Sequence, residues 1–570
     1  MANDLTVNET LSNTGNDNMN AYQAINNAHT NAGFERQESD ENELNGKIVK
    51  GREATSWAVV NGRSLQNGKL VNQNDGKQLS FTDPTQCEKE FHAGPSRSRV
   101  TGRLCLSVAS AIMGSVEFGY HTGVINAPEM HIKEFMNHTN VKRTGNAMDD
   151  VTIRSLFALT VSIFAVGGVI GGLTAGWWAN FLGRKGGMLV NNIIGIIASV
   201  LMFLSRVVDS YEIVIVGRFL IGINCGLYTG LTPMYLSEVS SLHIRGALGT
   251  LHQLGTVTGL FASQVLGFPE ILGNASYWNI LLGVGLTPLV LQLLTLPLCP
   301  ESPRYLLLTK NKESQAREAL IILRGTTHID DDIEEMKSEN NINEKDTPIG
   351  LMGLFREKSL RMPLIISIVM QLSQQFSGIN AIFYYSFNLF KHAGLSDTWS
   401  AHATSGVGGT MVVMSLITVP LMDRVGRRTL HLFGLGGMFI FSILITLSLS
   451  LTYLASWLRV ANIAVSLLYV VFFGLGPGSI PWLIVAEMFS QGPRPVAISV
   501  SVFTNWVANF TVGYCFPYMQ SGLGNFSFLP FTITLGLFFI FTAKFVPETK
   551  NRTIEQISQI WKKSGELNKL

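Results

Sequence analysis

About twelve apolar stretches, each near 20 residues long, follow one another along this chain after residue 103. Roughly 20 apolar residues in an α-helix cross the hydrocarbon core of a bilayer, and a helix satisfies its own backbone hydrogen bonds there. The chain is 46% hydrophobic and 14% charged, whereas about 25% of residues are charged in an average soluble protein. We therefore predict an all-α integral membrane fold. The predicted spans begin near residues 104, 154, 188, 211, 247, 277, 363, 402, 430, 459, 495 and 528.

A polar segment separates these spans into two sets of six. The charged motif after the second span, at 180–185, is repeated after the eighth span at 423–428. Such parallel repeats are typical of carriers whose two halves rock against each other, while the polar residues before the first span are too poor in large apolar side chains to fold alone. The expected organisation is a disordered cytosolic tail at 1–102, bundles at 103–300 and 362–548, a partly helical cytosolic loop at 301–361 and a short cytosolic tail at 549–570.

Charged residues gather at the ends of the spans. Lys and Arg fall in alternate loops, which predicts that these loops and both chain termini are cytosolic. Anchoring by positive residues explains the arginines but not the acids interleaved with them. We expect an ion-pair network that ties the two halves together in one conformation and breaks in another. Its candidate members are Arg184, Arg218, Glu238, Arg245, Asp423, Arg427, Glu487 and Arg494.

A string of amide and hydroxyl side chains at 371–386 lies inside the seventh span. A buried polar group without a partner costs about 1–3 kcal/mol, so several in one span indicate a wet cavity for a hydroxylated cargo. Gln374 and Gln375 share one face of an unbroken helix with Gln371, whereas Asn380 points elsewhere. Gly378 would let the helix unwind so that Asn380 turns inward too. The alternative is that these amides only bond neighbouring helices.

The tenth and eleventh spans carry a second set of polar and aromatic residues. Breakers precede Trp482 in the tenth span and predict a bend at a gate. Trp482 and Trp506 offer flat apolar faces and an N–H donor, which suits the C–H side of a sugar ring; a structural role for either Trp is the alternative. Amides accompany them at Asn505 and Asn509, and the fifth span contributes His252 and Gln253. The breakers are Gly474, Gly476, Pro477, Gly478 and Pro481.

The composition excludes several classes of function. A net charge of +2 without a basic stripe excludes nucleic-acid partners. The five cysteines have neither Cys-x-x-Cys spacing nor His neighbours at ligand intervals, so we expect no disulfide framework and no metal site. The Gly-rich run at 476–478 is followed by no Lys-Ser/Thr, so it is no phosphate loop. We expect no enzymatic activity and no cofactor.

Several long motifs together resemble the sugar porter family of the major facilitator superfamily, over residues 102–553. Within it the chain is most similar to the animal-type facilitative glucose transporters, through the residues at 118–128 and 489–495. The long Asn-rich tail differs from them and points to a fungal or other lower-eukaryotic member. The motifs are Arg218-Phe219, Pro233-Met234-Tyr235, the run at 245–254, Pro300-Glu301-Ser302-Pro303-Arg304, the string at 371–386, the runs at 423–428 and 476–482, and Pro547-Glu548-Thr549-Lys550.

The resemblance implies a major facilitator fold and transport of a hexose, glucose foremost, by alternating access. It implies an N-glycosylation sequon at Asn137. The chain differs from the pattern of the family at three positions. Met411 stands where an Asn is expected, Gly474 where a Glu is expected, and Phe181 where an Arg is expected. The sugar-contacting positions that the resemblance implies are Gln253, Gln374, Gln375, Asn380, Trp482 and Asn505.

Coupling to protons is a separate question. Proton-coupled members carry an Asp in the first span where this chain has His121, and Glu117 lies one turn earlier on the same face. His titrates near pH 6.5, so the two could load and release a proton; otherwise they simply pair at a helix interface. We expect facilitated diffusion. The alternatives are a proton-coupled sugar or polyol/inositol symporter and a sugar sensor that does not transport.

The predicted setting is a multi-pass membrane protein in contact with the lipid bilayer and a small-molecule sugar. We expect the plasma membrane, with a vacuolar or endosomal membrane as the alternative. The N-terminal tail is a candidate to bind trafficking or ubiquitin machinery.

Overall fold

The computed structural model describes residues 101–345, 350–451, 457–490 and 492–550, and the short stretches 59–60, 63–66, 69–72, 78–79, 552 and 556–557. The strands of the N-terminal unit form one antiparallel sheet in the order β1-β2-β3-β4. The sheet lies within residues 1–102, for which the composition predicts a disordered tail. Its strands are β1 (Val59–Val60), β2 (Arg63–Gln66), β3 (Lys69–Asn72) and β4 (Gln78–Leu79).

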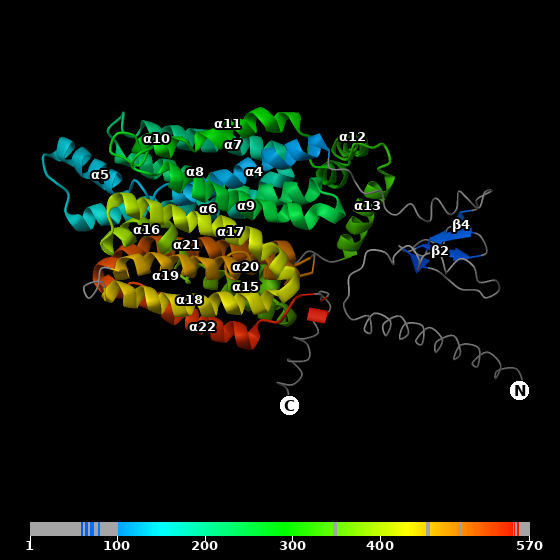
Figure 1. Cartoon of the computed structure of the whole chain (residues 1–570). Coiled ribbons are helices and arrows are strands. Elements are labelled where there is room, and N and C mark those ends of the chain that lie inside the picture. The colour runs from blue at the N-terminus through cyan, green and yellow to red at the C-terminus, as the bar shows by residue number, and fades with distance from the viewer. Residues whose placement is uncertain are drawn as a thin grey trace, which may run out of the picture. The chain divides into compact units, whose positions relative to one another are not determined.

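The second unit, residues 98–570, is helical throughout its described part. Its first half and second half lie side by side as two bundles of nearly parallel helices (Figure 1). The first half contains α4 (Gly102–Gly123), α5 (Glu129–Thr144), α6 (Asp150–Leu182), α7 (Arg184–Leu204), α8 (Tyr211–Val239), α9 (Leu242–Leu266), α10 (Trp278–Gly283) and α11 (Leu286–Thr295).

Three short helices connect the halves. They are α12 (Glu313–Arg324), α13 (Asp330–Lys345) and α14 (Leu351–Arg356), and α12 and α13 lie beyond the ends of the long helices (Figure 1). The second half contains α15 (Lys358–Gln375), α16 (Ile379–His392), α17 (Asp397–Val425), α18 (Arg427–Ser450), α19 (Trp457–Leu475), α20 (Ile480–Met488), α21 (Arg494–Leu523) and α22 (Leu529–Phe545).

The helices account for the predicted membrane spans. Among the described residues, eight helices are long and apolar enough to cross a membrane, and the shorter α22 is apolar as well. The remaining predicted spans correspond to α4, α9 and the pair α15 and α16. These are more polar, because they carry residues such as Glu117, His252 and Gln374. A membrane helix that keeps such residues must bury them in the protein or line a cavity with them.

Glycines bring the helix backbones into direct contact. A Cβ atom on Gly119 of α4 would lie 1.7 Å from the carbonyl oxygen of Thr256 on α9, and one on Gly259 of α9 would lie 2.0 Å from that of Val116. Small residues allow such approaches, which is how membrane helices pack when no hydrophobic effect separates them from lipid. Any larger residue at these two positions would push α4 and α9 apart.

The two halves pack mainly along two helix pairs, α6 with α21 and α9 with α17, and α4 makes a smaller contact with α16. At the first contact Trp506 of α21 lies against Gly168 of α6, where a Cβ atom would come within 2.5 Å of its ring. We call the end of the bundles that carries Arg184 and Arg427 the inner end, and the opposite end the outer end. The two contacts leave the central helices α4, α8, α15 and α16 to position polar side chains.

Candidate functional site

The seventh predicted span is broken in its middle, as the glycine in the amide string led us to expect. Helix α15 stops at Gln375, α16 starts at Ile379, and Gly378 between them has φ +86°. A left-handed φ is readily adopted only by glycine. The turn rotates the next helix so that the Asn380 side chain donates a hydrogen bond back to Gln375 Oε1. Asn380 therefore faces the same cluster as the amides of α15.

The amides form one hydrogen-bonded cluster between α15, α16 and α21. Asn505 donates through Nδ2 to Gln371 Oε1 at 2.8 Å and to Gln374 Oε1 at 2.7 Å. Gln375 Nε2 donates to Asn505 Oδ1 at 3.1 Å. Each of these side chains is at most 6% exposed. We name Gln371, Gln374, Gln375, Asn380 and Asn505 the amide cluster.

The tenth span also breaks where its sequence predicts. Helix α19 ends at Leu475 and α20 begins at Ile480, which frees backbone carbonyls between them. Gln374 Nε2 donates to two of these, Pro477 O at 2.8 Å and Gly478 O at 2.7 Å. The amide cluster is thereby bonded directly to the break between α19 and α20, so movement of that break must disturb the cluster.

The two tryptophans lie in different surroundings. Trp506 is 3% exposed and packs on Phe118 and Phe164 with ring centroids 5.9 and 5.7 Å away. It fills the contact between the halves, which is the structural alternative considered for it. Trp482, near the start of α20, is 37% exposed. Gln253 is partly exposed on α9.

Gly474 leaves room for methionine side chains. A Cβ atom on Gly474 would lie 2.7 Å from Met414 Cβ and 4.0 Å from Met411 Sδ. The two departures from the expected pattern, Met411 and Gly474, therefore lie at one contact between α17 and α19. A glutamate at 474 would require the methionines to move.

A second buried polar group lies in the first half. Glu117 and His121 of α4 are both fully buried and their nearest side-chain atoms are 3.0 Å apart. Arg218 of α8 is also fully buried and donates through Nη1 to His121 O at 2.8 Å. Its guanidinium lies 4.6 Å from the ring centre of Phe164.

This placement corrects the expectation that Arg218 belongs to the network at the inner end. Arg218 lies two turns from the outer start of α8, whereas Glu238 lies at the other end of the same helix. Twenty residues of helix separate them by about 30 Å. The sequence alone does not show how far along the span Arg218 lies from the inner end. Only the contact between α8 and α4 reveals its partners.

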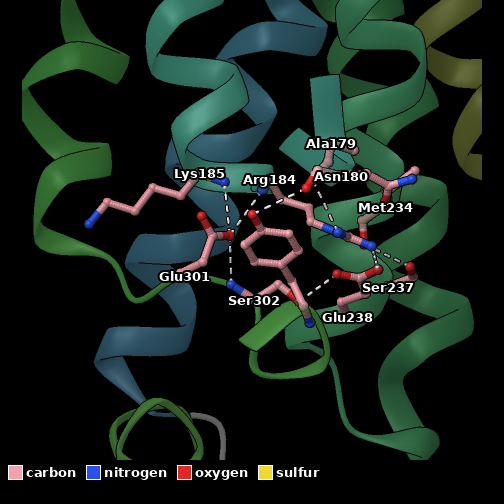
Figure 2. Close-up of polar contacts among 10 residues, drawn as sticks. Ala179, Asn180, Arg184, Lys185, Met234, Ser237, Glu238, Glu301 and Ser302 are labelled. Atoms are coloured by element: carbon pink, nitrogen blue, oxygen red, sulfur yellow. Dashed lines mark hydrogen bonds and ion pairs between the residues drawn. The ribbon is translucent and has the colours of Figure 1, made fainter. Parts of the chain in front are cut away.

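The inner end of the first half is organised around Arg184 (Figure 2). Arg184 Nη2 donates to Glu238 Oε1 at 2.7 Å. Glu301 Oε1 accepts hydrogen bonds from the backbone N–H groups of Arg184 and Lys185 at 3.1 and 3.0 Å. Ser302 donates to the second oxygen of Glu238. Glu301 thus caps the first turn of α7, where the unpaired N–H groups and the helix dipole favour a carboxylate.

The second half repeats this arrangement. Arg427 Nε donates to Glu487 Oε1 at 3.2 Å, and the carboxylate of Glu548 accepts from the backbone N–H groups of Arg427 and Arg428 at 2.9 and 3.1 Å. Arg494 donates to Phe489 O. In this conformation the pairs Arg184–Glu238 and Arg427–Glu487 each lie within one half, so a tie between the halves at the inner end stays a prediction. The side chains of Arg245 and Asp423 lie outside the described residues.

The outer end is joined by hydrogen bonds between the halves. Asn126, just after α4, donates to Phe383 O at 3.0 Å and Ser386 Oγ at 2.7 Å, and accepts from Phe387 N at 3.1 Å. Gln264 of α9 accepts from Gly408 N of α17 at 3.0 Å. The structure therefore represents a conformation closed at its outer end.

Some of these residues were not predicted as site residues. Asn126, Gln264, Glu301 and Glu548 all make contacts that fix a helix or join the halves. The repeated acid-containing motifs at 300–304 and 547–550 were a usable signal for the last two. Asn126 lies in the motif at 118–128, which marked the resemblance but not this contact, and Gln264 lies in none of the motifs named above.

The predicted glycosylation position, Asn137, lies on α5 at the outer end of the first half, and its Oδ1 accepts from Met148 N at 2.9 Å. This end lies opposite the arginine-rich motifs, as a glycosylated residue requires if those motifs are cytosolic.

Comparisons with known proteins identify the family to which the chain belongs. The model of the family "Sugar (and other) transporter" matches residues 107–561. The chain is 46% identical over 470 residues to the facilitated glucose transporter member 1 of solute carrier family 2 from Gallus gallus, covering 82% of this chain and 96% of the relative. It is 46% identical over 477 residues to member 4 from Homo sapiens, covering 83% and 93%.

The fold is similar to that of the xylose transporter XylE from E. coli in a partially occluded inward open conformation. The TM-score is 0.67 at 24% identity, with 80% of this chain and all of that chain covered. This agrees with the major facilitator fold of two six-helix bundles predicted from the apolar stretches. The chain belongs to the sugar transporter family, among the relatives of the facilitated glucose transporters.

Proposed function

We propose that this protein carries a hexose, glucose foremost, across a membrane by alternating access and facilitated diffusion. The observation that carries the proposal is the amide cluster, five buried amides held between helices of a membrane protein. A hydroxyl group both donates and accepts hydrogen bonds, so the hydroxyls of a sugar can take the place of the amide partners. The facilitated glucose transporters named above are the relatives that support glucose as the cargo.

The proposed contacts to the sugar come from both halves. Gln374, Gln375, Asn380 and Asn505 supply amides from the second half, and Trp482 supplies a partly exposed ring on α20. Gln253 on α9 is the proposed contribution of the first half. The inner ion pairs, with Arg245 and Asp423 as further proposed members, would hold the first turns of helices while the halves rock.

Uptake measurements test the proposal. We expect purified protein in liposomes to equilibrate radiolabelled glucose but not to concentrate it, and to show accelerated exchange when unlabelled glucose is placed on the far side. Competition by a panel of hexoses and polyols, inositol included, would rank the cargo. Sugar binding without flux in a transporter-null cell would contradict transport and favour a sensor.

A second candidate, proton-coupled transport, is favoured by one observation. Glu117 and His121 are fully buried at 3.0 Å from each other, beside the equally buried Arg218. Such a group could hold a proton in one conformation and release it in another. Accumulation of glucose driven by an imposed pH gradient would establish coupling; its absence, together with exchange that is insensitive to the gradient, would leave the pair as a helix contact.

We further propose the orientation and setting. The arginines at the inner end support a cytosolic location for that end and for both termini. In this orientation Asn137 would lie outside the membrane, where glycosylation occurs. The plasma membrane is the proposed location, with trafficking or ubiquitin machinery as the proposed partner of the N-terminal tail. Glycosidase treatment of Asn137→Gln protein and protease protection of tagged termini test these assignments.

A further inference from the structure

His431 is a fully buried histidine on α18, a helix that contributes nothing to the amide cluster. Its Nε2 lies 3.3 Å from the hydroxyl oxygen of Ser373 on α15. Ser373 is the residue directly before Gln374. A single histidine in an apolar helix is by itself uninformative, so its neighbours decide what it does.

The Ser373 hydroxyl has two neighbours with which it can bond. It lies 2.7 Å from Met370 O one turn earlier in α15 and 3.3 Å from His431 Nε2. A hydroxyl can donate one hydrogen bond and accept others, so it can pair with either tautomer of a neutral imidazole. His431 also lies against the backbone of Gly476 in the break between α19 and α20. The ring thus connects α15 with that break.

The backbone around His431 packs equally closely on the break between α19 and α20. A Cβ atom on Gly476 would lie 3.1 Å from His431 Cα and 2.8 Å from Leu430 O. One turn further along α18, a Cβ atom on Gly434 would lie 2.6 Å from Pro477 Cδ. This turn of α18 cannot shift without moving the break.

The end of α15 is consequently held to that break in two ways. Gln374 bonds Pro477 O and Gly478 O directly, and Ser373, one residue earlier, reaches the same segment through His431 and the backbone of α18. Two attachments on adjacent residues fix the rotation of the last turn of α15 about its axis. That rotation decides where the Gln374 and Gln375 amides point.

The matching position in the described part of the first half offers no such attachment. Arg184 and Arg427 occupy the same place at the start of α7 and α18, and four residues later come Met188 and His431 respectively. Met188 is buried but offers no N–H donor. The attachment belongs to the half that carries the amide cluster.

We propose that His431 is a positioning residue, which through Ser373 and the α19–α20 break aims the amide cluster at the sugar. The inference rests on the proposed function of that cluster. Loss of one hydrogen bond of this kind is expected to weaken sugar affinity about three- to ten-fold while leaving the maximal rate less affected.

Two substitutions of His431 distinguish positioning from packing. The amide nitrogen of His431→Gln reaches about as far as Nε2, so this variant should keep a KM near that of the wild type. His431→Asn ends near the position of Nδ1, so it should raise KM like Ser373→Ala. The double variant of His431→Asn with Ser373→Ala should be no worse than either alone, because both remove the same bond.

A control variant separates this effect from general loosening of α18. Asn462 donates to Ser448 Oγ at 2.7 Å in another buried bond between α18 and α19, far along the helix from the break. Asn462→Ala should lower thermal stability without raising KM. Equal KM increases for Asn462→Ala and His431→Asn would overturn the proposal, as would a KM for His431→Asn equal to that of the wild type.

A second measurement needs no sugar. Hydrogen–deuterium exchange of the purified protein in lipid nanodiscs should quicken over the last turn of α15 in His431→Asn but not in His431→Gln. If the wild type transports no hexose yet this exchange pattern holds, the proposed function is wrong and the positioning stands. Transport of hexose with unchanged exchange in His431→Asn would mean that His431 does not position α15.

Discussion

At the scale of single residues, the amide cluster is the part of the site that sequence predicted best. Glutamines and asparagines are conspicuous in an apolar span, because burying them without partners is costly. The direction of Asn380 followed from recognising that Gly378 could interrupt the helix, and the structure confirms the interruption with φ +86° at Gly378. Chemistry that depends on residue type was therefore readable from the sequence.

The sequence does not reveal the role of a residue when that role depends on its position along a membrane span or on a partner far away in the chain. Arg218 was expected at the inner end, but it lies beside His121 because α8 places it near the outer end. No local sequence pattern indicates the role of His431, because its partner Ser373 is 58 residues earlier in the chain. Neither position is fixed by local periodicity; each needs the packing of two helices.

The first prediction concerns Gln374 and Asn505. Replacing either by Ala removes hydrogen bonds to the cargo and to the other amide, so we expect sugar affinity to fall about three- to ten-fold for each. Together they should be less than additive, since they share a bond of 2.7 Å. Uptake kinetics at equal amounts of surface protein would check this, and unaltered kinetics in both single variants would mean that the cargo binds elsewhere.

At the scale of helices, each half uses one carboxylate to fix one helix start. Glu301 caps α7 and Glu548 caps α18, although the two acids come from different motifs more than 200 residues apart in the chain. The sequence showed the repeat of the arginine motifs but not that these acids complete them. An acid can be assigned as a cap only when the N–H groups it reaches are known.

The second prediction is that Glu301→Gln and Glu548→Gln each destabilise the half in which they lie. A neutral amide keeps part of the hydrogen bonding but loses the charge that the helix start favours, so we expect a loss of about 0.5–2 kcal/mol. Thermal unfolding of the purified variants would measure it. As a control, Glu334→Gln on α13 alters an exposed acid and should leave the unfolding temperature within about a degree, since exposed charges contribute little.

At the scale of the whole molecule, the conformation is set by contacts at the outer end. Asn126 makes three hydrogen bonds to α16, each from a side-chain atom to the other half of the protein. The inner ion pairs Arg184–Glu238 and Arg427–Glu487 stay within their halves. Opening the outer end thus requires breaking the contacts of Asn126.

The third prediction follows from that requirement. Asn126→Ala should shift the population toward conformations open at the outer end, because about 1 kcal/mol per lost hydrogen bond is enough to change a two-state ratio several-fold. Spin labels can replace the exposed Val141 and Trp399, at the outer ends of the two halves. In Asn126→Ala, double electron–electron resonance should then show a population with a longer distance between the two labels. Asn140→Ala, which loses only a bond within its own loop to Asn146 O, should leave the distances unchanged.

The way in which the amides already bond one another has a consequence for the speed of the carrier. Asn505, Gln374 and Gln375 satisfy each other at 2.7–3.1 Å. If the cargo binds at the amide cluster as proposed, an arriving hydroxyl gains only the difference between two similar sets of bonds. The affinity would then be modest, which favours rapid release. A site of unpaired amides would hold sugar more tightly and release it more slowly, and slow release limits turnover.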